Sequence, residues 1–432
     1  MLFLILVLSG VSVAQRKPPG LDFWRLQQQI ATKLQTHEYE PALKLLKELN
    51  ELLPNCPRTL FRIAIAEGFL NRETDLYHHI DSLIRMKVYY DLSTEPAFIR
   101  FRQTPTFKRL ILEMSKIKNG SQYKASVAFR IPDRNFIPEG IAFDSHTNSF
   151  FVASIRERKI IQIRSDGSVS DFITSRQNDI WSISGIGIDT KRRLLWACST
   201  AFEGAEGYSP DKKEVAVYAF SLKNGNLAGT YPLQQPGENH FCDGLTVARD
   251  GTVFVADPSA LVVYRLDPDS HQLNILIPPE AGISPQGLAI SEQDARLFIS
   301  DYVQGIYLLD LKSGQIASVA SRSSQSLAGI DGLNAIGSDL IAIQNGIEPS
   351  RVVRLHMSSD GTTVKSIETL EINHPLFGEP TLGVIKDDSL FFIANNAVGK
   401  YLKDRDVASL PEPIVLSRRL SAPRARKNLK EQ

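Results

Sequence analysis

The stretch Asp243-Gly244-Leu245-Thr246, followed by Val253-Phe254-Val255-Ala256, contains a pattern that recurs through the last two thirds of the chain. A polar residue, a glycine and an aliphatic pair come first, and a turn then leads into a short apolar run. Six copies begin at intervals of 43 to 59 residues. Their first residues are Glu139, Ser184, Asp243, Gln286, Asp331 and, in a looser copy without the glycine, Glu379.

Each copy has the pattern of a small antiparallel sheet. Turn dipeptides such as Asp166-Gly167 and Asp250-Gly251 separate the apolar runs, as hairpin geometry requires, and a third run such as 261–264 follows. Units of about 45 residues with several short strands each are typical of propeller blades. We therefore predict a mainly β protein, a six-bladed β-propeller over residues 125–420, in which residues 410–420 supply an outer strand.

Residues 20–118 show helical spacing instead. Apolar residues recur at three- and four-residue steps in segments 21–34, 42–53, 60–69 and 76–88. Helix pairs about 30–35 residues apart are typical of tetratricopeptide-type (TPR-like) repeats. Such a region either offers a groove to a peptide or protein partner or packs on the propeller as a cap, and the pattern leaves both open.

The two ends of the chain have unusual composition. Residues 1–14 are apolar from Leu2 to Leu8 and then small up to Ala14, which resembles a secretory signal peptide without a basic start. The alternative, a membrane anchor, is disfavoured because a spanning helix needs about 20 apolar residues. We expect a secreted or periplasmic protein with no transmembrane segment in the mature chain and a basic, flexible tail at 421–432.

Composition excludes several classes of protein. With 49 Lys and Arg against 48 Asp and Glu, the net charge of +1 gives no basis for nucleic-acid binding by the whole chain. Three cysteines are too few for a disulfide scaffold, although Cys198 and Cys242 fall near the same end of neighbouring blades and are a candidate pair. Neither a Gly-x-Ser-x-Gly elbow nor a phosphate-binding glycine loop with lysine is present.

Equivalent residues of successive blades form rings around the central channel of a propeller. The residues that begin the six copies include four carboxylates, and a second set lies 14 to 16 positions later: Ser154, Ser199, Asp257, Asp301, Asn345 and Asn395. Clustered carboxylates raise one another's pKa unless a cation lies among them, and oxygen ligands favour Ca²⁺, Mg²⁺ or Mn²⁺. The alternative is that these residues satisfy strand ends. The predicted metal ligands are Glu139, Asp243, Gln286, Asp331 and Asn345.

The Glu-Gly phrase at 139–140 and the Asp-Gly-Leu phrases at 243–245 and 331–333 resemble the senescence marker protein-30/gluconolactonase/LRE-like family. More distantly they resemble paraoxonases and strictosidine synthases. The resemblance covers residues 125–420 and implies a divalent cation at the channel top, Ca²⁺ foremost, with Mg²⁺, Mn²⁺ or Zn²⁺ as alternatives. It also implies hydrolysis of sugar lactones or related esters.

The family's ligand roles can be carried over residue by residue. The resemblance assigns the Glu of the first blade to Glu139, and the Asp of a later blade, ligand and general base, to Asp331. Asp243 stands where the family has an Asn. Ser184 and Gln286 depart from the amides expected at their positions, which weakens gluconolactone itself as the substrate.

These features predict an exported, metal-dependent hydrolase of a small-molecule lactone or ester. Its candidate catalytic residues are Asp331, Glu379 and His240, with His240 as a proton shuttle. Two alternatives remain open. One is a non-catalytic propeller that holds a protein partner with its helical repeats, and the other is a strictosidine synthase-like lyase in which Glu379 acts without metal.

Overall fold

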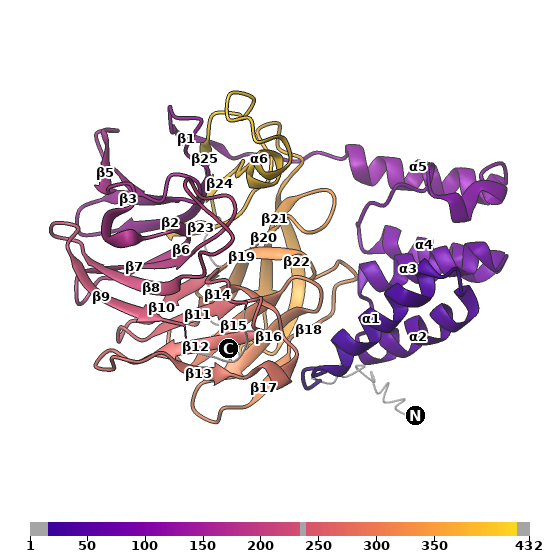
Figure 1. Ribbon diagram of the computed structural model, residues 1–432. Helices are drawn as coiled ribbons and strands as arrows, with labels where there is room; N and C mark the ends of the chain where they lie inside the picture. Colours follow the sequence, from indigo (N-terminus) through magenta and orange to yellow (C-terminus); the bar gives the residue numbers. More distant parts are fainter. Residues whose placement is uncertain (1–15, 234–238, 421–432) are drawn as a thin grey trace, which may run out of the picture.

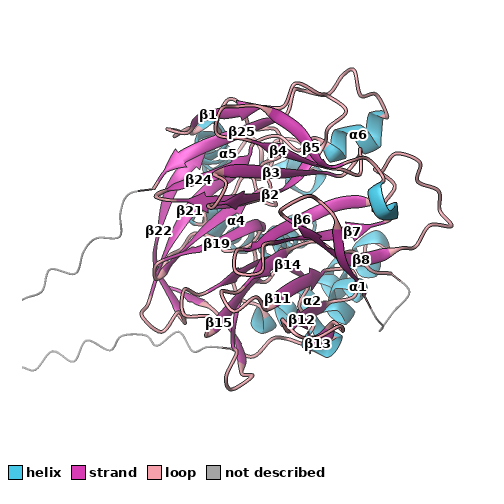
Figure 2. Cartoon of the chain, turned by 90° about the vertical axis from the view of Figure 1, so that its left-hand side faces the viewer, coloured by secondary structure: helices cyan, strands magenta, loops and turns pink. Residues whose placement is uncertain are grey.

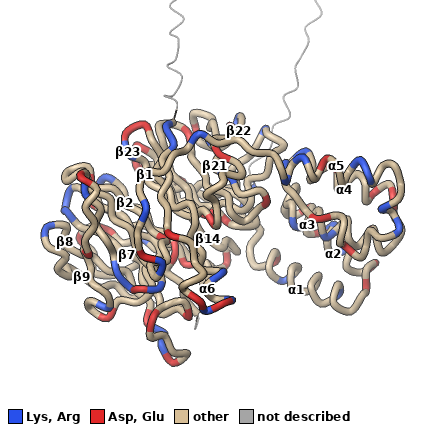
Figure 3. Tube along the Cα trace, turned by 90° about the horizontal axis from the view of Figure 1, so that it is seen from above, with Lys and Arg blue, Asp and Glu red and all other residues tan. Residues whose placement is uncertain are grey.

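The computed structural model describes residues 16–233 and 239–420, and these form two regions, a helical one and a β-rich one (Figure 1). The predicted signal peptide (1–14) and basic tail (421–432) lie outside the described residues. Within the described part of the chain, no helix combines the length and apolar composition that a bilayer crossing requires. Acidic and basic residues are interspersed over both regions (Figure 3).

The β-rich region is a six-bladed propeller, as predicted, because its strands form six sheets whose innermost strands neighbour one another in a closed ring. From the channel outward, blade one consists of β2 (Pro138–Asp144), β3 (Ser149–Ser154), β4 (Ile160–Ile163) and β5 (Val169–Ile173). Blade two consists of β6 (Ser182–Asp189), β7 (Leu194–Thr200), β8 (Val215–Ser221) and β9 (Leu227–Pro232). Blade three consists of β10 (Leu245–Val247), β11 (Val253–Asp257), β12 (Val262–Leu266) and β13 (Asn274–Ile277).

The remaining three blades follow the same order, and the fifth gains a short parallel strand at its outer edge. Blade four consists of β14 (Pro285–Ile290), β15 (Arg296–Asp301), β16 (Gly305–Asp310) and β17 (Ile316–Ser318). Blade five consists of β19 (Ile330–Ile336), β20 (Asp339–Gln344), β21 (Arg351–Met357), β22 (Thr363–Ile372) and β18 (Ala320–Ser321). Blade six consists of β23 (Gly383–Lys386), β24 (Ser389–Ile393), β25 (Ile414–Arg419) and β1 (Ser126–Arg130).

The sixth blade closes the ring with strands from both ends of the propeller sequence. β25 completes this blade, but the prediction that it is the outer strand was wrong, because β25 is the third strand and β1 lies outside it. β1 pairs antiparallel with β25, for example Ser126 with Ser417. A five-residue strand without the repeated phrase carries no repeat signal, so the sequence pattern did not reveal this closure.

The helical region consists of α1 (Asp22–Gln35), α2 (Tyr39–Leu52), α3 (Pro57–Phe69), α4 (Glu73–Arg85), the 3₁₀ helix η1 (Pro96–Phe101) and α5 (Pro105–Asn119). Pro57 stands in the first turn of α3, where a missing N–H costs nothing. The apolar faces meet in one core, in which Phe23, Phe98 and Phe107 are fully buried. The four predicted helices are thus present, whereas their assignment to the TPR class stays a prediction.

The helical region packs on loops of the fourth and fifth blades. The Tyr89 N–H donates to the Glu348 carbonyl at 2.7 Å, and the Trp24 indole donates to the Gly282 carbonyl at 3.0 Å. Ile347, in the loop after β20, belongs to the core of the helical region. Figure 2 shows the helices behind the propeller, so the region packs as a cap, and a partner groove stays a prediction.

Three short helices lie in loops of the propeller: η2 (Gln177–Asp179), η3 (Pro279–Ala281) and α6 (Val398–Asp404). α6 lies between β24 and β25, at the top of Figure 1. Its Tyr401 and Val398 pack with Ile137 and Ile155 of the first blade. α6 therefore lies beside blades six and one, and the helical region packs on loops of blades four and five. Both lie beside the starts of the inner strands.

Candidate functional site

The glycine of the repeated phrase marks a place where neighbouring blades come very close. A Cβ on Gly140 would stand 2.1 Å from the Ser184 carbonyl oxygen. The same contact would be 2.3 Å from Gly185 to Asp243, 2.1 Å from Gly244 to Gln286, 2.3 Å from Gly287 to Asp331 and 2.7 Å from Gly332 to Thr381. Only glycine fits such an approach. These contacts place the residues before the glycines in one ring, as the sequence predicts.

The sixth position of this ring belongs to Thr381 and not to Glu379. Gly383 pairs with Phe392 in the sixth blade as Leu333 pairs with Ala342 in the fifth, so Gly383 and Leu333 are equivalent positions. Two residues before these positions, Thr381 is therefore equivalent to Asp331. Glu379 lies two residues earlier, in the exposed loop that leads into β23. Its charge still reaches the ring, because it contributes to the raised pKa of Asp331.

The carboxylates of the ring are close enough to repel one another. Burial raises the pKa of Glu139 well above its usual range, and the charges of Asp331 and Asp243 raise it further. Burial and the Asp331 charge raise the pKa of Asp243 to about 8. Burial also raises the pKa of Asp331, to about 6, although a hydrogen bond from Asn345 opposes the shift. Without a cation, this part of the propeller therefore disfavours the charged form of its carboxylates.

In the part of the chain that the structure describes, no cationic side chain relieves this repulsion. Among residues 16–233 and 239–420, none of Glu139, Asp243, Asp331 and Glu379 forms an ion pair with Lys, Arg or His. In the same residues no three His, Cys, Asp or Glu side chains stand in an arrangement that would hold a metal ion. The side chains of the ring nevertheless suit a hard divalent cation, because the ligand atoms they offer are oxygens and their negative charge is uncompensated.

Asn345 is the one predicted amide that contacts a carboxylate of the ring. Its Nδ2 donates to Asp331 Oδ2 at 2.6 Å, and its Oδ1 accepts from the Tyr302 hydroxyl at 2.6 Å. Gln344 pairs with Ile330 in the same register in which Asp301 pairs with Pro285, so the residue equivalent to Asp301 is Gln344 and not Asn345. In the fifth blade, the predicted second ring was therefore displaced by one residue.

Sequence reasoning missed three residues beside the carboxylates. Tyr302 is 36% exposed at the channel mouth, and burial together with the charges of Asp331 and Glu379 raises its pKa. The buried Asn396 donates to the Glu139 carboxylate, while Asn395 bonds to the backbone of Glu412 and Ile414. Tyr302 directly follows Asp301 as Asn345 follows Gln344, so extending the second ring by one residue could have found it. The same step from Asn395 could have found Asn396, whereas Thr381 has no equivalent signal.

Gln286 and Ser184 differ in what they offer to the ring. The Gln286 side chain is half-buried and has no hydrogen-bond partner among the described residues, so its amide is available. The Ser184 hydroxyl donates to the backbone carbonyl of Cys242. This serine, noted as a departure from the family pattern, therefore holds the neighbouring blade in place.

His240 is oriented by an aspartate. Its Nδ1 lies 2.6 Å from Asp257 Oδ2, and Asp257 is fully buried. The other oxygen of Asp257 accepts the N–H groups of Phe241 at 3.1 Å and Ala260 at 3.0 Å. Because the Asp257 charge also raises the pKa of Asp243, the His240–Asp257 pair lies near the ring. A histidine held in this way can move a proton at its free nitrogen.

The candidate cysteine pair is joined. Cys198 on β7 and Cys242 form a disulfide with a Cα–Cα distance of 5.2 Å, and Cys56 is a buried free cysteine. The bond joins β7 to the segment 239–244, which lies outside the assigned strands and carries both His240 and Asp243. The disulfide thus positions two predicted site residues.

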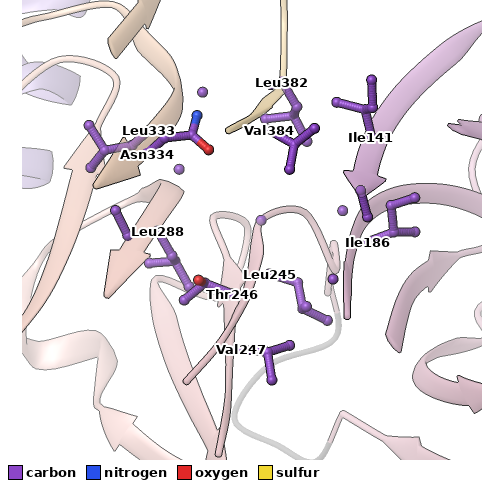
Figure 4. A pocket seen from close by; sticks show the side chains of 18 of the residues that line it. Ile141, Ile186, Leu245, Thr246, Val247, Leu288, Leu333, Asn334, Leu382 and Val384 are labelled. Atoms are coloured by element: carbon purple, nitrogen blue, oxygen red, sulfur yellow. The ribbon is translucent and has the colours of Figure 1, made fainter. Parts of the chain in front are cut away.

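Beyond the ring, the central channel is apolar. A cavity of about 310 Å³ is lined by the inner strands of all six blades, among them Ile141, Ile186, Leu245, Leu288 and Leu333 (Figure 4). The labelled polar side chains in this view are Thr246 and Asn334. The arrangement is a polar, negatively charged mouth above an apolar channel.

A six-bladed propeller with a carboxylate-lined mouth is the class of protein that the fold and site define. No protein-family model matches the sequence, and no curated protein matches it. Similar solved structures include a gluconolactonase from Xanthomonas campestris, with 16% identity over 70% of this chain and 98% of that one, at a TM-score of 0.47.

Two further structures have comparable similarity. Regucalcin from Agrobacterium tumefaciens, described as a calcium-binding protein, has 15% identity over 68% of this chain and 93% of that one, at a TM-score of 0.49. A luciferin-regenerating enzyme has 13% identity over 69% of this chain and 96% of that one, at a TM-score of 0.49. Gluconolactonase and regucalcin are thus among the structures that the chain resembles, as the repeated motif predicts.

Proposed function

We propose that this protein is a divalent-cation-dependent hydrolase of a small lactone or ester, with its reaction centre at the mouth of the propeller channel. The observation that carries the proposal is the cluster formed by Glu139, Asp243, Asp331 and Glu379, whose charges meet without a cationic side chain among the described residues. Such a cluster is costly unless a ligand uses it. The lactone class follows from the motif resemblance described above.

Glu139, Asp243 and Asp331 would hold the ion, with the amide oxygens of Gln286 and Asn345 as further donors. Ca²⁺ is the first candidate because all of these are oxygen ligands, and Mg²⁺, Mn²⁺ or Zn²⁺ are the alternatives. When bound, the cation would polarise an ester or lactone carbonyl and stabilise the charge that develops on its oxygen.

Asp331 is suited to act as the general base. In the chain without the ion, a pKa of about 6 leaves Asp331 mostly ionised at neutral pH, as a general base must be. Asn345 occupies its Oδ2, which leaves Oδ1 to accept a proton from an attacking water. Tyr302, through its hydrogen bond to Asn345, fixes the amide that orients this carboxylate.

His240 is suited to deliver a proton to the leaving alkoxide. Asp257 holds its Nδ1, so Nε2 is the nitrogen left to exchange a proton. Glu379 is exposed in the loop at the mouth and is a second candidate for this role. Exchanging His240→Gln and Glu379→Gln separately identifies which side chain does so, because the high-pH limb of the pH–rate profile, where a proton donor loses its proton, changes only for the residue that donates.

We also propose that the chain is exported. The disulfide between Cys198 and Cys242 supports an oxidising compartment, since such bonds are rare where glutathione keeps thiols reduced. The apolar start of the sequence supports the same conclusion.

The test of the activity is a panel of five- and six-membered lactones and aryl esters, assayed with Ca²⁺ and again with a chelator. Hydrolysis that needs the ion and falls by at least about 100-fold in Asp331→Asn supports the proposal. Arg249→Gln is the matched control, because Arg249 is exposed and its side chain forms no hydrogen bond or ion pair among the described residues. Turnover that persists in the chelator, or in Asp331→Asn, contradicts it.

A further inference from the structure

A second cavity lies between the helical region and the propeller. Its volume is about 480 Å³, within the range of small-molecule sites. One wall is the loop between α2 and α3 with the end of α4, and the other is the segment from Ser318 to Ala328 with the loop after β15. It is separate from the carboxylate ring, since none of the ring residues lines it.

The charge of this cavity is one-sided. Arg16, Lys17 and Arg85 line it, and no Asp or Glu does. None of the three forms an ion pair with a carboxylate among residues 16–233 and 239–420. Arg85 donates to the Ser82 hydroxyl at 2.6 Å, and Arg16 donates to the Glu51 carbonyl at 2.8 Å, so both retain unused N–H groups.

The neutral part of the lining is suited to an organic molecule. Leu52, Leu53 and Met86 from the helical side face Val303 and Leu327 from the propeller side. The hydroxyls of Ser323 and Ser326 on the same wall supply further donors, since both only accept hydrogen bonds from backbone N–H groups. Those of Ser321 and Ser324 already donate to the carbonyls of Ser323 and Arg85. A ligand with an apolar body and an anionic group would contact both parts of the surface.

One buried polar atom in the lining has no partner. Gln325 Oε1 is buried and accepts no hydrogen bond. Buried polar atoms in native proteins are nearly always bonded, so an unbonded one in a cavity wall indicates a missing donor. An N–H or O–H group on the ligand would supply it.

We propose that this cavity binds a small organic anion that has an apolar body, a carboxylate or phosphate, and at least one N–H or O–H group. Arg16, Lys17 and Arg85 pair with the anionic group at the rim, and Gln325 accepts from the donor. Because its two walls come from different regions, the ligand stabilises the packing of the helical region on the propeller.

The test uses three probes, of which two have the same apolar body and differ in charge. N-acetyl-leucine has the apolar body, the N–H and the carboxylate, whereas N-acetyl-leucinamide has no charge, and inorganic phosphate has charge without a body. Thermal unfolding and calorimetric titration of the full chain measure each. We expect saturable binding and a raised Tm with N-acetyl-leucine, and at least about tenfold weaker binding of the amide, as for loss of a charge-assisted hydrogen bond.

Variants separate a built site from adventitious binding. Arg85→Gln and Arg16→Gln should each weaken N-acetyl-leucine binding at least about tenfold, and both should fold because the two side chains are exposed. Arg249→Gln should leave it unchanged. Saturable binding of phosphate that Arg85→Gln abolishes assigns the site to phosphorylated ligands. Equal binding of acid and amide, or binding that Arg85→Gln does not weaken, overturns the proposal.

Discussion

The Asn345 amide donates to the Asp331 carboxylate at 2.6 Å, and this contact links the channel mouth to the helical region. Asn345 begins the loop whose Ile347 lies in the core of the helical region. The next loop residue, Glu348, accepts the Tyr89 N–H at 2.7 Å. The packing of the helices on this loop therefore fixes the backbone of Asn345, which is the hydrogen-bond partner of the proposed base Asp331.

Asn345→Ala should free Asp331 without removing it. Because the amide hydrogen bond lowers the pKa of Asp331, its loss should shift the acid limb of lactone hydrolysis, where the base becomes protonated, to higher pH and reduce kcat by about 10- to 100-fold. Tyr302→Phe, which leaves this hydrogen bond in place, should have the smaller effect. The pH–rate profiles of the two variants measure both, and an unchanged profile in Asn345→Ala contradicts the assigned role.

Gly244→Ala should destabilise the propeller severely. The new Cβ would stand 2.1 Å from the Gln286 carbonyl oxygen, so two blades would have to separate. We expect a loss above about 4 kcal/mol, or failure to fold. Gly167→Ala is the control: its Cβ would meet nothing within 4 Å, and only its positive φ costs free energy, about 1 kcal/mol. Urea unfolding compares the two, and equal losses would refute the packing argument.

The ion pair of the buried Asp144 with the half-buried Arg193 should make stability depend on acid pH. Burial raises the pKa of Asp144, but the hydrogen bonds from Arg193, at 2.6 and 2.7 Å, together with those from Thr147 and the His146 N–H, outweigh burial and lower it to about 2. The folded protein thus binds this proton more weakly than the unfolded chain does. The stabilisation is complete above about pH 4 and is lost as the pH falls to about 2.

Replacing one partner of this pair tests the same contact. Arg193→Leu leaves the Asp144 carboxylate buried without its cation, which should cost about 3–5 kcal/mol at pH 7. Asp144→Asn should cost less and remove this part of the acid dependence. Chemical unfolding at a series of pH values measures both, and an acid dependence that survives in Asp144→Asn would exclude this pair as its source.

The disulfide has a simple chemical test. The denatured, unreduced chain should contain one reactive thiol, Cys56, and the reduced chain three. Cys198→Ser combined with Cys242→Ser should lower stability by about 2–5 kcal/mol and should lower activity further, since the bonded segment carries Asp243 and His240. Thiol titration measures the first expectation, and three thiols without reductant would contradict the bond.

The sequence predicted the propeller well because its signal is periodic. The glycine in Asp243-Gly244 is required by blade contacts, so the phrase that revealed the six blades also located the ring. Thr381 and β1 escaped prediction because neither repeats the phrase. Tyr302 and Asn396 directly follow Asp301 and Asn395 of the predicted second set. They were missed because the repeat pattern does not show that the following side chain reaches the carboxylate ring.

The sequence allowed us to predict which residues form the ring of the candidate site. It did not allow us to predict all the hydrogen bonds that their side chains make. Asp331 and Glu139 were correctly placed at one level, whereas the hydroxyl of Ser184 is used by the backbone of Cys242. The cavity between the regions could not have been predicted, since Arg85 and Gln325 lie 240 residues apart and meet only through the docking of the helices.

Calcium titration of the purified chain tests the central claim most directly. If the carboxylate cluster is a cation site, calorimetry should show one Ca²⁺ per chain. Binding should weaken at least tenfold in Glu139→Gln and in Asp331→Asn, as for loss of a charged ligand, and remain unchanged in Arg249→Gln. Absence of binding for Ca²⁺, Mg²⁺, Mn²⁺ and Zn²⁺, or equal Ca²⁺ binding in all variants, would contradict the proposed site.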